Sequence, residues 1–304
     1  MVSTIVVKLG QVVLSLLVLL LLVFTIVRFT GDPILFLLTP QASAAQEARL
    51  REELGLDKPA PIQFVAYLGQ LSRGDLGISF RTKRPVSDLI VQRIPATFAM
   101  GAGAVGLTLI VAIPLGVYSA YRRGGRLDRA ARWIAALGQA VPEFWLGLLL
   151  ILFFAVFLRI LPSGGFSSPA HLILPSITLA FGSIAGMIRL LRSSMIETLS
   201  SDFVLFLRAK GVPEHVILWK HALRNAGLTT LSFLGIVIAG LFTGSVLVET
   251  IFNWPGIGLL FIEGVRFRDF GVVQGVMLFF GIAYIGTNLL VDVAYLVLNP
   301  KLRS

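Results

Sequence analysis

The sequence predicts an all-α, polytopic membrane protein with six transmembrane helices. Three observations lead to this fold class: the composition, the long apolar runs, and the distribution of positive charge along the chain. Of the 304 residues, 56% are hydrophobic and only 14% are charged. A soluble domain has about a quarter of its residues charged, so this chain has too few polar side chains to cover a water-facing surface. Most of its surface must therefore face an apolar medium.

Six long apolar runs are the candidate spans, because a helix needs about 20 apolar residues to cross the hydrocarbon layer. They cover approximately residues 9–28, 98–121, 133–158, 171–188, 226–250 and 270–298. The first run resembles a signal peptide in position only. Its uncharged stretch from Leu9 to Val27 is longer than the roughly 7–15 apolar residues of a signal peptide, so it is expected to be retained as a span.

The positive charges predict the orientation of the spans. With a cytoplasmic N-terminus, the inside segments hold 14 Lys and Arg residues and the two short outside loops hold three. The positive-inside rule therefore predicts that both termini are cytoplasmic. The outside segment 29–97 is too long for that rule, and it is expected to form a small external cap with helices over 44–54, ended by Gly55, and over 62–72. The chain is expected to be one transmembrane domain, 1–304.

The composition also excludes several kinds of site. The net charge of +10 follows mostly from topology, so no nucleic-acid partner is expected. The chain has no cysteine and three scattered histidines, so neither a metal site nor a clustered catalytic set of a membrane-embedded enzyme is expected. No glycine-rich loop ending in Gly-Lys is present to hold nucleotide phosphates. We therefore expect no bound cofactor, no metal and no enzymatic reaction, and any energy source must be another chain.

The largest predicted cytoplasmic loop, 189–225, carries the most specific motif. Its run Ser201–Gly211, followed by His221–Ala226, resembles the cytoplasmic motif of ABC importer permeases. The resemblance is closest to the B-type permeases for dipeptides, oligopeptides, glutathione and nickel, which are inner-membrane components of binding-protein-dependent transport. Weaker matches to the same family lie at residues 54–59, 73–79, 94–97, 248–258, 288–292 and 299–303.

The resemblance implies a type I ABC importer permease fold and a place in the bacterial cytoplasmic membrane. It implies as partners a second homologous permease, two ATPase subunits that bind the ATP, and an extracytoplasmic solute-binding protein. A short helix around Ala209–Gly211 would sit in a groove of one ATPase and transmit its movement to the spans. The residues that the resemblance implies in this coupling are Asp202, Arg208, Ala209, Lys210, Gly211 and Val212.

One departure from the family pattern lies inside this coupling segment. Leu205, Phe206 and Leu207 are bulkier and more apolar than the Arg-Thr-Ala-like run of family members. We interpret them as a more apolar docking surface for the ATPase of this system. Gly211 is expected to end the coupling helix, and Pro213 suits the first turn of the helix that follows.

Two acids within the spans are candidates for the translocation pathway or its gate. Glu143 follows Pro142 in the third run, and an acid at mid-membrane costs roughly 2.5–3.5 kcal/mol and normally faces protein or water. Either Glu143 lines the pathway and favours cationic solutes, or the span begins near Leu137 and Glu143 lies by the cytoplasmic headgroups. Pro142 also frees a backbone carbonyl nearby. Glu249, at the outer end of the fifth run, either gates the outer mouth or contacts the binding protein, or it hydrogen-bonds the loop that follows.

A third intramembrane acid, Asp292, lies near the cytoplasmic end of the last run. A structural role is expected for it. Its carboxylate would pair with a base such as Arg189 or Arg192, or with free backbone donors.

These features together favour the transmembrane subunit of an ATP-driven importer that forms a translocation pathway with a second permease. Peptides rank first as cargo because of the breadth of the family, and a nickel, nickel-chelate or glutathione importer permease is the nearest alternative. A secondary transporter is a weaker alternative. It predicts charged relays within the spans and inverted repeats, whereas the chain has one acid deep in a span and no evident repeat.

Overall fold

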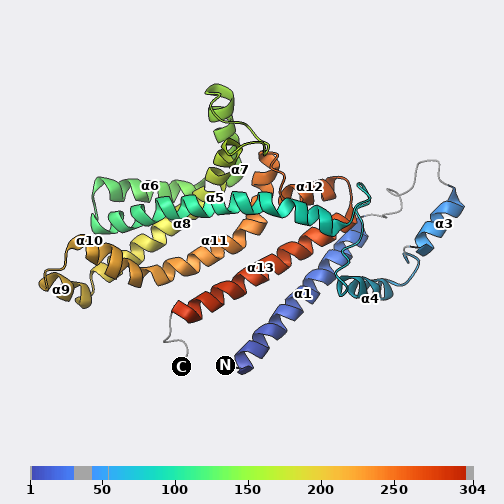
Figure 1. Cartoon of the computed structure of the whole chain (residues 1–304), viewed down its shortest axis with the longest axis horizontal. Coiled ribbons are helices and arrows are strands. Elements are labelled where there is room, and N and C mark those ends of the chain that lie inside the picture. The colour runs from blue at the N-terminus through green and yellow to red at the C-terminus, as the bar shows by residue number, and fades with distance from the viewer. Residues whose placement is uncertain (1, 31–42, 54, 299–304) are drawn as a thin grey trace. The chain divides into compact units, whose positions relative to one another are not determined.

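The computed structural model describes the backbone of residues 2–30, 43–53 and 55–298 (Figure 1). It describes their side chains too, apart from residues 2–9, 27–30, 44, 50, 53, 228–229, 239, 241–244 and 291–298. Most of this described chain is helical, and it contains no strand, only an isolated bridge between Ile78 and Pro85. The prediction of an all-α fold is confirmed.

The helices follow one another with short connections. The first are α1 (Val2–Thr30), α3 (Ala44–Glu53), α4 (Ala60–Leu71) and α5 (Val86–Tyr121). The next are α6 (Arg126–Ala140), α7 (Glu143–Leu150), the π-helix η1 (Ile151–Phe157), α8 (Ala170–Leu199) and α9 (Asp202–Ala209). The last are α10 (Glu214–Val216), the π-helix η2 (Ile217–Ala222), α11 (Leu223–Ile251), α12 (Ile257–Arg266) and α13 (Phe270–Leu298).

The first of two compact units consists of residues 1–95 and 255–285. Here the beginning of α5 packs against α12 and α13 through an apolar cluster of Val86, Ile90, Ile257, Leu260, Val272 and Val276. The two helices predicted for the external cap are present as α3 and α4. Gly55 has φ +63°, a left-handed conformation that glycine adopts readily and that stops the preceding helix, as the sequence predicts.

A buried carboxylate fixes one corner of this first unit. Asp269, between α12 and α13, is only 3% exposed. Its two oxygens accept hydrogen bonds from the Ser79 hydroxyl and from the backbone N–H groups of Phe80, Arg81 and Val272. The loop before α5 is thereby bound to the α12–α13 corner, and each polar group removed from water receives a partner.

The second unit consists of residues 96–254 and 286–304. Its central helix is α8, which packs against α6, α7 and α11. The approach of α6 to α8 is close because α6 carries a glycine at the contact. A Cβ atom on Gly138 would collide with Ala185 and with the carbonyl oxygen of Phe181 on α8. The backbones can therefore approach more closely than larger side chains would allow.

A sharp bend separates α6 from α7. The two helix axes differ by 106° across the break at Val141–Pro142, and Figure 1 shows α7 turning away from α6 at this point. Pro142 has no N–H and cannot continue the hydrogen bonding of α6, so it instead caps the N-terminus of α7. The predicted span 133–158 is therefore not one straight helix but a broken one.

Several helices in the described chain are long and apolar enough to cross a membrane. They are α5, α8 and the Phe270–Leu290 part of α13, and the bent pair of α6 with α7–η1 is a fourth candidate. The Gly10–Ile26 part of α1 is a shorter apolar helix. The second predicted span, 98–121, is the later part of a helix that begins at Val86. The count of six spans, their boundaries and the cytoplasmic position of both termini stay predictions.

Candidate functional site

The predicted coupling segment folds as the short helix α9, whose N-terminal end is set by local signals. Ser201 is its N-cap residue, with extended backbone angles. Asp202 lies in the first turn, where its negative charge suits the positive end of the helix dipole, and Arg208 lies in the last turn, where the opposite sign is favoured. The sequence run that carries the family motif therefore favours a helix of this length.

The C-terminal end of α9 is fixed by Gly211. Its φ of +76° is left-handed, and its N–H donates to the carbonyl of Arg208 at 2.9 Å. The N–H of Val212 donates to the carbonyl of Leu207 at 3.1 Å. These two bonds form a Schellman motif, which turns the chain sharply out of the helix. Pro213 then caps the short helix α10, so α9 is bounded on both sides by defined turns.

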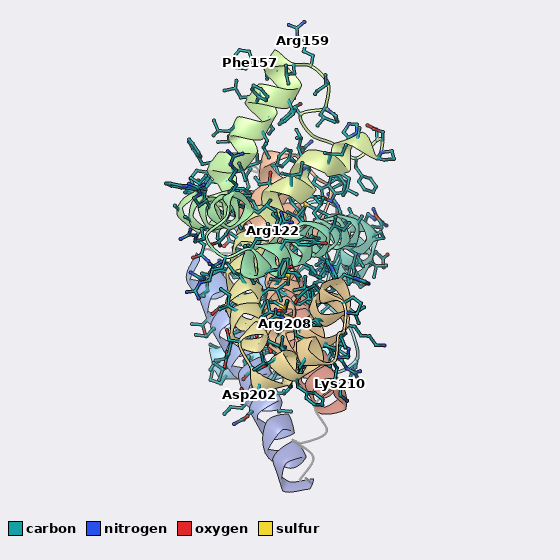
Figure 2. The ribbon with its side chains drawn as sticks, turned by 90° about the vertical axis from the view of Figure 1, so that its left-hand side faces the viewer. Arg122, Phe157, Arg159, Asp202, Arg208 and Lys210 are labelled. Atoms are coloured by element: carbon teal, nitrogen blue, oxygen red, sulfur yellow. The ribbon has the colours of Figure 1, made fainter. Side chains whose placement is uncertain are left out.

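The exposed surface of α9 is unusually apolar. Val204 is fully buried and holds the helix to the rest of its unit, whereas Leu205 is 66% exposed and Phe206 is 58% exposed. The Lys210 ammonium lies 4.5 Å from the centre of the Phe206 ring, a cation–π contact. In Figure 2, Asp202 and Lys210 lie at the end of the unit opposite to η1. The helix thus presents large apolar side chains flanked by charges.

One ion pair braces the turn that follows α9. The Arg208 guanidinium donates to the Glu214 carboxylate, with Nε–Oε1 at 2.7 Å. The Glu214 carboxylate raises the pKa of Arg208, chiefly through this hydrogen bond. Both side chains are about two-fifths exposed, so the pair is screened and contributes about 0–1 kcal/mol to stability. Its main effect is to fix the path of the chain from α9 through the turn into α10.

The second candidate site lies at the α6–α7 break. Glu143 is the first residue of α7, and its side chain is half-buried. Its Oε1 atom lies 3.6 Å from the place that a Cβ atom on Gly182 of α8 would occupy. The carbonyl oxygen of Gly138, in the last turn of α6, lies 3.7 Å from the same place. Two electronegative oxygens from the two halves of the broken helix therefore meet beside Gly182.

A cavity of about 260 Å³ opens in front of this carboxylate. Glu143 is the only charged residue among its described lining, which otherwise comes from α8 and α11. The other lining residues include Leu179, Gly182, Ser183, Phe233 and Ile236. The sequence prediction that Glu143 faces a pathway stays a prediction, and this cavity gives it a defined location.

Glu249 has a very different environment. It is fully buried at the end of α11, and its Oε1 accepts a hydrogen bond from the Thr97 hydroxyl of α5 at 2.9 Å. Five residues further on, the Trp254 indole N–H donates to the carbonyl of Ala96 at 2.8 Å. Two motifs that are distant in the sequence, 94–97 and 248–258, are joined here by paired hydrogen bonds. This geometry favours a structural role for Glu249 over a gating role.

The predicted partners of Asp292 are bonded elsewhere. The Arg192 guanidinium makes a two-pronged contact with Asp128, at 2.6 and 3.1 Å, and Arg189 donates to the side chain of Gln139. Both bonds tie α8 to α6. The side chain of Asp292 itself lies outside the described residues, so its predicted structural role stays a prediction.

Comparison of the sequence with known protein families shows to which family the chain belongs. Residues 112–304 match the family described as "Binding-protein-dependent transport system inner membrane component". Residues 1–101 match the N-terminal family that is described for the same transport-system membrane component. The chain belongs to the binding-protein-dependent inner-membrane permeases.

Curated relatives of this permease cover nearly all of its length. A "Probable peptide ABC transporter permease protein" of Sinorhizobium fredii is 39% identical over 92% of this chain and 93% of the relative. A glutathione transport system permease of Pectobacterium atrosepticum is 39% identical over 95% of both chains. An oligopeptide transport system permease of Bacillus subtilis is 36% identical over 90% of both. This permease is therefore a transport subunit of the inner membrane and not an enzyme.

Solved structures show the fold of this permease independently. Two inward-facing crystal structures of the MetNI methionine ABC transporter match with TM-scores of 0.58 and 0.60, at 19% identity. Each match covers 69% of this chain and 96% of the other. The predicted type I ABC importer permease fold is confirmed. The chain is the transmembrane subunit of an ABC importer, and an ATPase is among its partners.

Two structural carboxylates of this permease were not singled out from the sequence. Asp128 is 1% exposed and binds Arg192, which lies 64 positions further along the chain. Asp269 binds the Ser79 loop across 190 positions. Neither pairing follows a helical or strand spacing. The one available signal was that both acids adjoin basic residues in segments predicted outside the spans.

Proposed function

We propose that this permease forms, with a second homologous permease, the translocation pathway of an importer for peptides. Two ATPase subunits bind the ATP, and an extracytoplasmic solute-binding protein delivers the cargo. This chain itself binds no cofactor or metal in the proposal. The observation that carries it is the apolar exposed surface of α9, on a chain whose family matches cover residues 1–101 and 112–304.

The contact with an ATPase is assigned to α9 and the turn after it. Asp202, Arg208, Ala209, Lys210, Gly211 and Val212 form the proposed coupling site. Leu205 and Phe206 are exposed on the side of the protein that the charge distribution predicts to be cytoplasmic, where lipid does not cover them. Large apolar side chains surrounded by charges are typical of an interface centre. The Schellman turn at Gly211 would keep α9 rigid, so that ATPase movement is passed to α8 and α11.

Peptide is proposed as the cargo because the relatives named for peptide or oligopeptide transport align over at least nine-tenths of both chains. A relative named for glutathione transport aligns as well, and glutathione is itself a small peptide. Nickel remains the alternative from the resemblance alone. A secondary transporter would need no ATPase, and the match to ABC transporter permeases speaks against it.

The test is co-purification of the importer in mild detergent through a tag on this chain. The wild-type chain is expected to bring along an ATPase and a second permease, identified by mass spectrometry. The double variant Leu205→Ala, Phe206→Ala removes two apolar anchors, so at least about tenfold less ATPase is expected. Leu127→Ala is the matched control, because Leu127 is 45% exposed on α6 rather than α9 and should leave recovery unchanged.

Two results would contradict the proposal. A lone chain that transports solute without any ATPase would return the secondary transporter to first place. Equal loss of ATPase in the double variant and in the Leu127→Ala control would show that α9 is not the docking helix. Retention of the second permease in the double variant serves as the check that the chain is still folded.

A further inference from the structure

The break between α6 and α7 creates a carbonyl group that its own helix cannot satisfy. In a continuous helix, the carbonyl of Gly138 would accept the N–H of the residue four positions later. That residue is Pro142, which has no N–H. The Gly138 oxygen instead lies at the negative end of α6, within 4 Å of the Cβ position of Gly182.

Glu143 adds a carboxylate at the same place. Within the described part of the chain, no hydrogen-bond donor and no Lys, Arg or His pairs with its carboxylate. A half-buried carboxylate without a partner is unfavourable inside a membrane protein, and such groups mark substrate or ion pathways. The positive N-terminal end of α7 offsets part of the cost of burying this carboxylate. It supplies no donor on the side of the carboxylate that faces the cavity.

The chemical groups that line the cavity restrict the kind of cation that could bind there. Metal ions need several converging ligands, and among the described residues no group of three or more His, Cys, Asp or Glu side chains could hold one. An ammonium group has three N–H donors and needs three acceptors. The Glu143 carboxylate and the Ser183 hydroxyl offer acceptors in the lining of the cavity, and the Gly138 carbonyl lies beside Gly182, which lines the same cavity. The apolar remainder, including Leu179 and Phe233, suits the carbon chain that carries the amine.

We propose that this cavity is a subsite for the ammonium group of the cargo, held by Glu143 and the free carbonyl end of α6. The inference rests on the proposed function, since a peptide carries such a group at its amino terminus. Gly182 is required because its missing side chain leaves the space between the two oxygens. The subsite selects cargo with a free amine during passage, after release from the binding protein.

The test measures binding of alanyl-alanine and of N-acetyl-alanyl-alanine to the intact importer in lipid nanodiscs, without binding protein. Equilibrium dialysis with labelled peptide gives the two dissociation constants. Wild type is expected to prefer the free amine on the order of tenfold, the usual effect of a charge-assisted hydrogen-bonded contact. Glu143→Gln is expected to reduce this ratio to near one, and Glu197→Gln, on the exposed side of α8, to leave it unchanged.

A second variant tests the geometry rather than the charge. A Cβ atom at Gly182 would make ordinary contacts at 3.6 and 3.7 Å, so Gly182→Ala is expected to fold while its methyl group narrows the space beside the two oxygens. The preference for the free amine should fall as it does in Glu143→Gln. Gly227→Ala on α11 is the control, because a Cβ atom there meets nothing within 4 Å.

The outcomes separate this inference from the proposed function. An equal affinity for both peptides in wild type, or an unchanged preference in Glu143→Gln, overturns the subsite. Competition by millimolar sodium or magnesium that abolishes the preference overturns it too, because the site would then hold a bare cation. The amount of ATPase that co-purifies is measured on the same preparation. An assembled importer that shows no preference for the free amine contradicts only the subsite. A chain that recovers no ATPase contradicts the proposed function.

Discussion

Two carboxylates within this permease contrast in the way that each is held. Asp269 is 3% exposed and accepts hydrogen bonds from one hydroxyl and three backbone N–H groups. Glu143 is half-buried, faces a cavity and receives no hydrogen bond from the described residues. The first satisfies the rule that buried polar groups are paired, and the second departs from it.

The contrast distinguishes structural from functional acids. A carboxylate whose oxygens all have donors contributes to stability, and its removal leaves several buried donors unpaired. A carboxylate without donors contributes nothing comparable, so its desolvation is a net penalty that a passing ligand would relieve. Glu249 and Asp128 belong with Asp269, since both are buried and bonded. Substitutions at the four acids should therefore fall into two classes.

The largest effect on stability is expected at Asp269. Asp269→Ala would leave the Ser79 hydroxyl and three backbone N–H groups without their acceptor. The free energy of unfolding should fall by about 3–5 kcal/mol. Thermal unfolding in detergent and proteolysis of the loop before α5 would measure this. A change below about 1 kcal/mol would mean that the corner is held by other contacts.

A somewhat smaller effect is expected at Asp128. Asp128→Asn removes the charge that binds Arg192 at 2.6 Å, and Arg192 is about one-fifth exposed, so that water can replace part of the lost contact. We expect a loss of about 2–3 kcal/mol. A double-mutant cycle with Arg192→Gln would isolate the pair. Additive effects of the two substitutions would show that the two side chains are not coupled.

The bond between Thr97 and Glu249 should contribute less. Thr97→Val removes one hydroxyl donor while keeping the shape of the side chain, and a loss of about 1 kcal/mol is expected. Glu249→Gln keeps an acceptor for Thr97 and should alter both stability and ATP-dependent uptake only slightly. Abolished uptake by a stable Glu249→Gln importer would instead favour the gating role.

Features encoded by neighbouring residues could be predicted from the sequence. The helical class, the end of α9 at Gly211 and the stop at Gly55 depend on composition and on single glycines. The carbonyl freed by Pro142 was also predicted. Each of these signals acts within a few residues, so that no knowledge of the tertiary fold is needed.

Features that depend on packing could not be predicted. The bend of 106° needs α7 to pack on α8, and Pro142 alone is equally compatible with a modest kink. Arg192 was one of the expected partners of Asp292, and the structure shows it bonded to Asp128, on a helix that only the fold brings near. The meeting of Glu143 with the Gly138 carbonyl depends on the same bend.

The most direct test of the distinction between structural and functional acids uses the reconstituted importer carrying Glu143→Gln. Its ATP-dependent uptake and its melting temperature are measured on the same sample. Since Glu143 has no hydrogen-bond or ion-pair partner among the described residues, stability should change by less than about 1 kcal/mol, while uptake of free-amine peptide should fall on the order of tenfold. Unchanged uptake together with a large loss of stability would contradict the account, because Glu143 would then be a structural acid like Asp269.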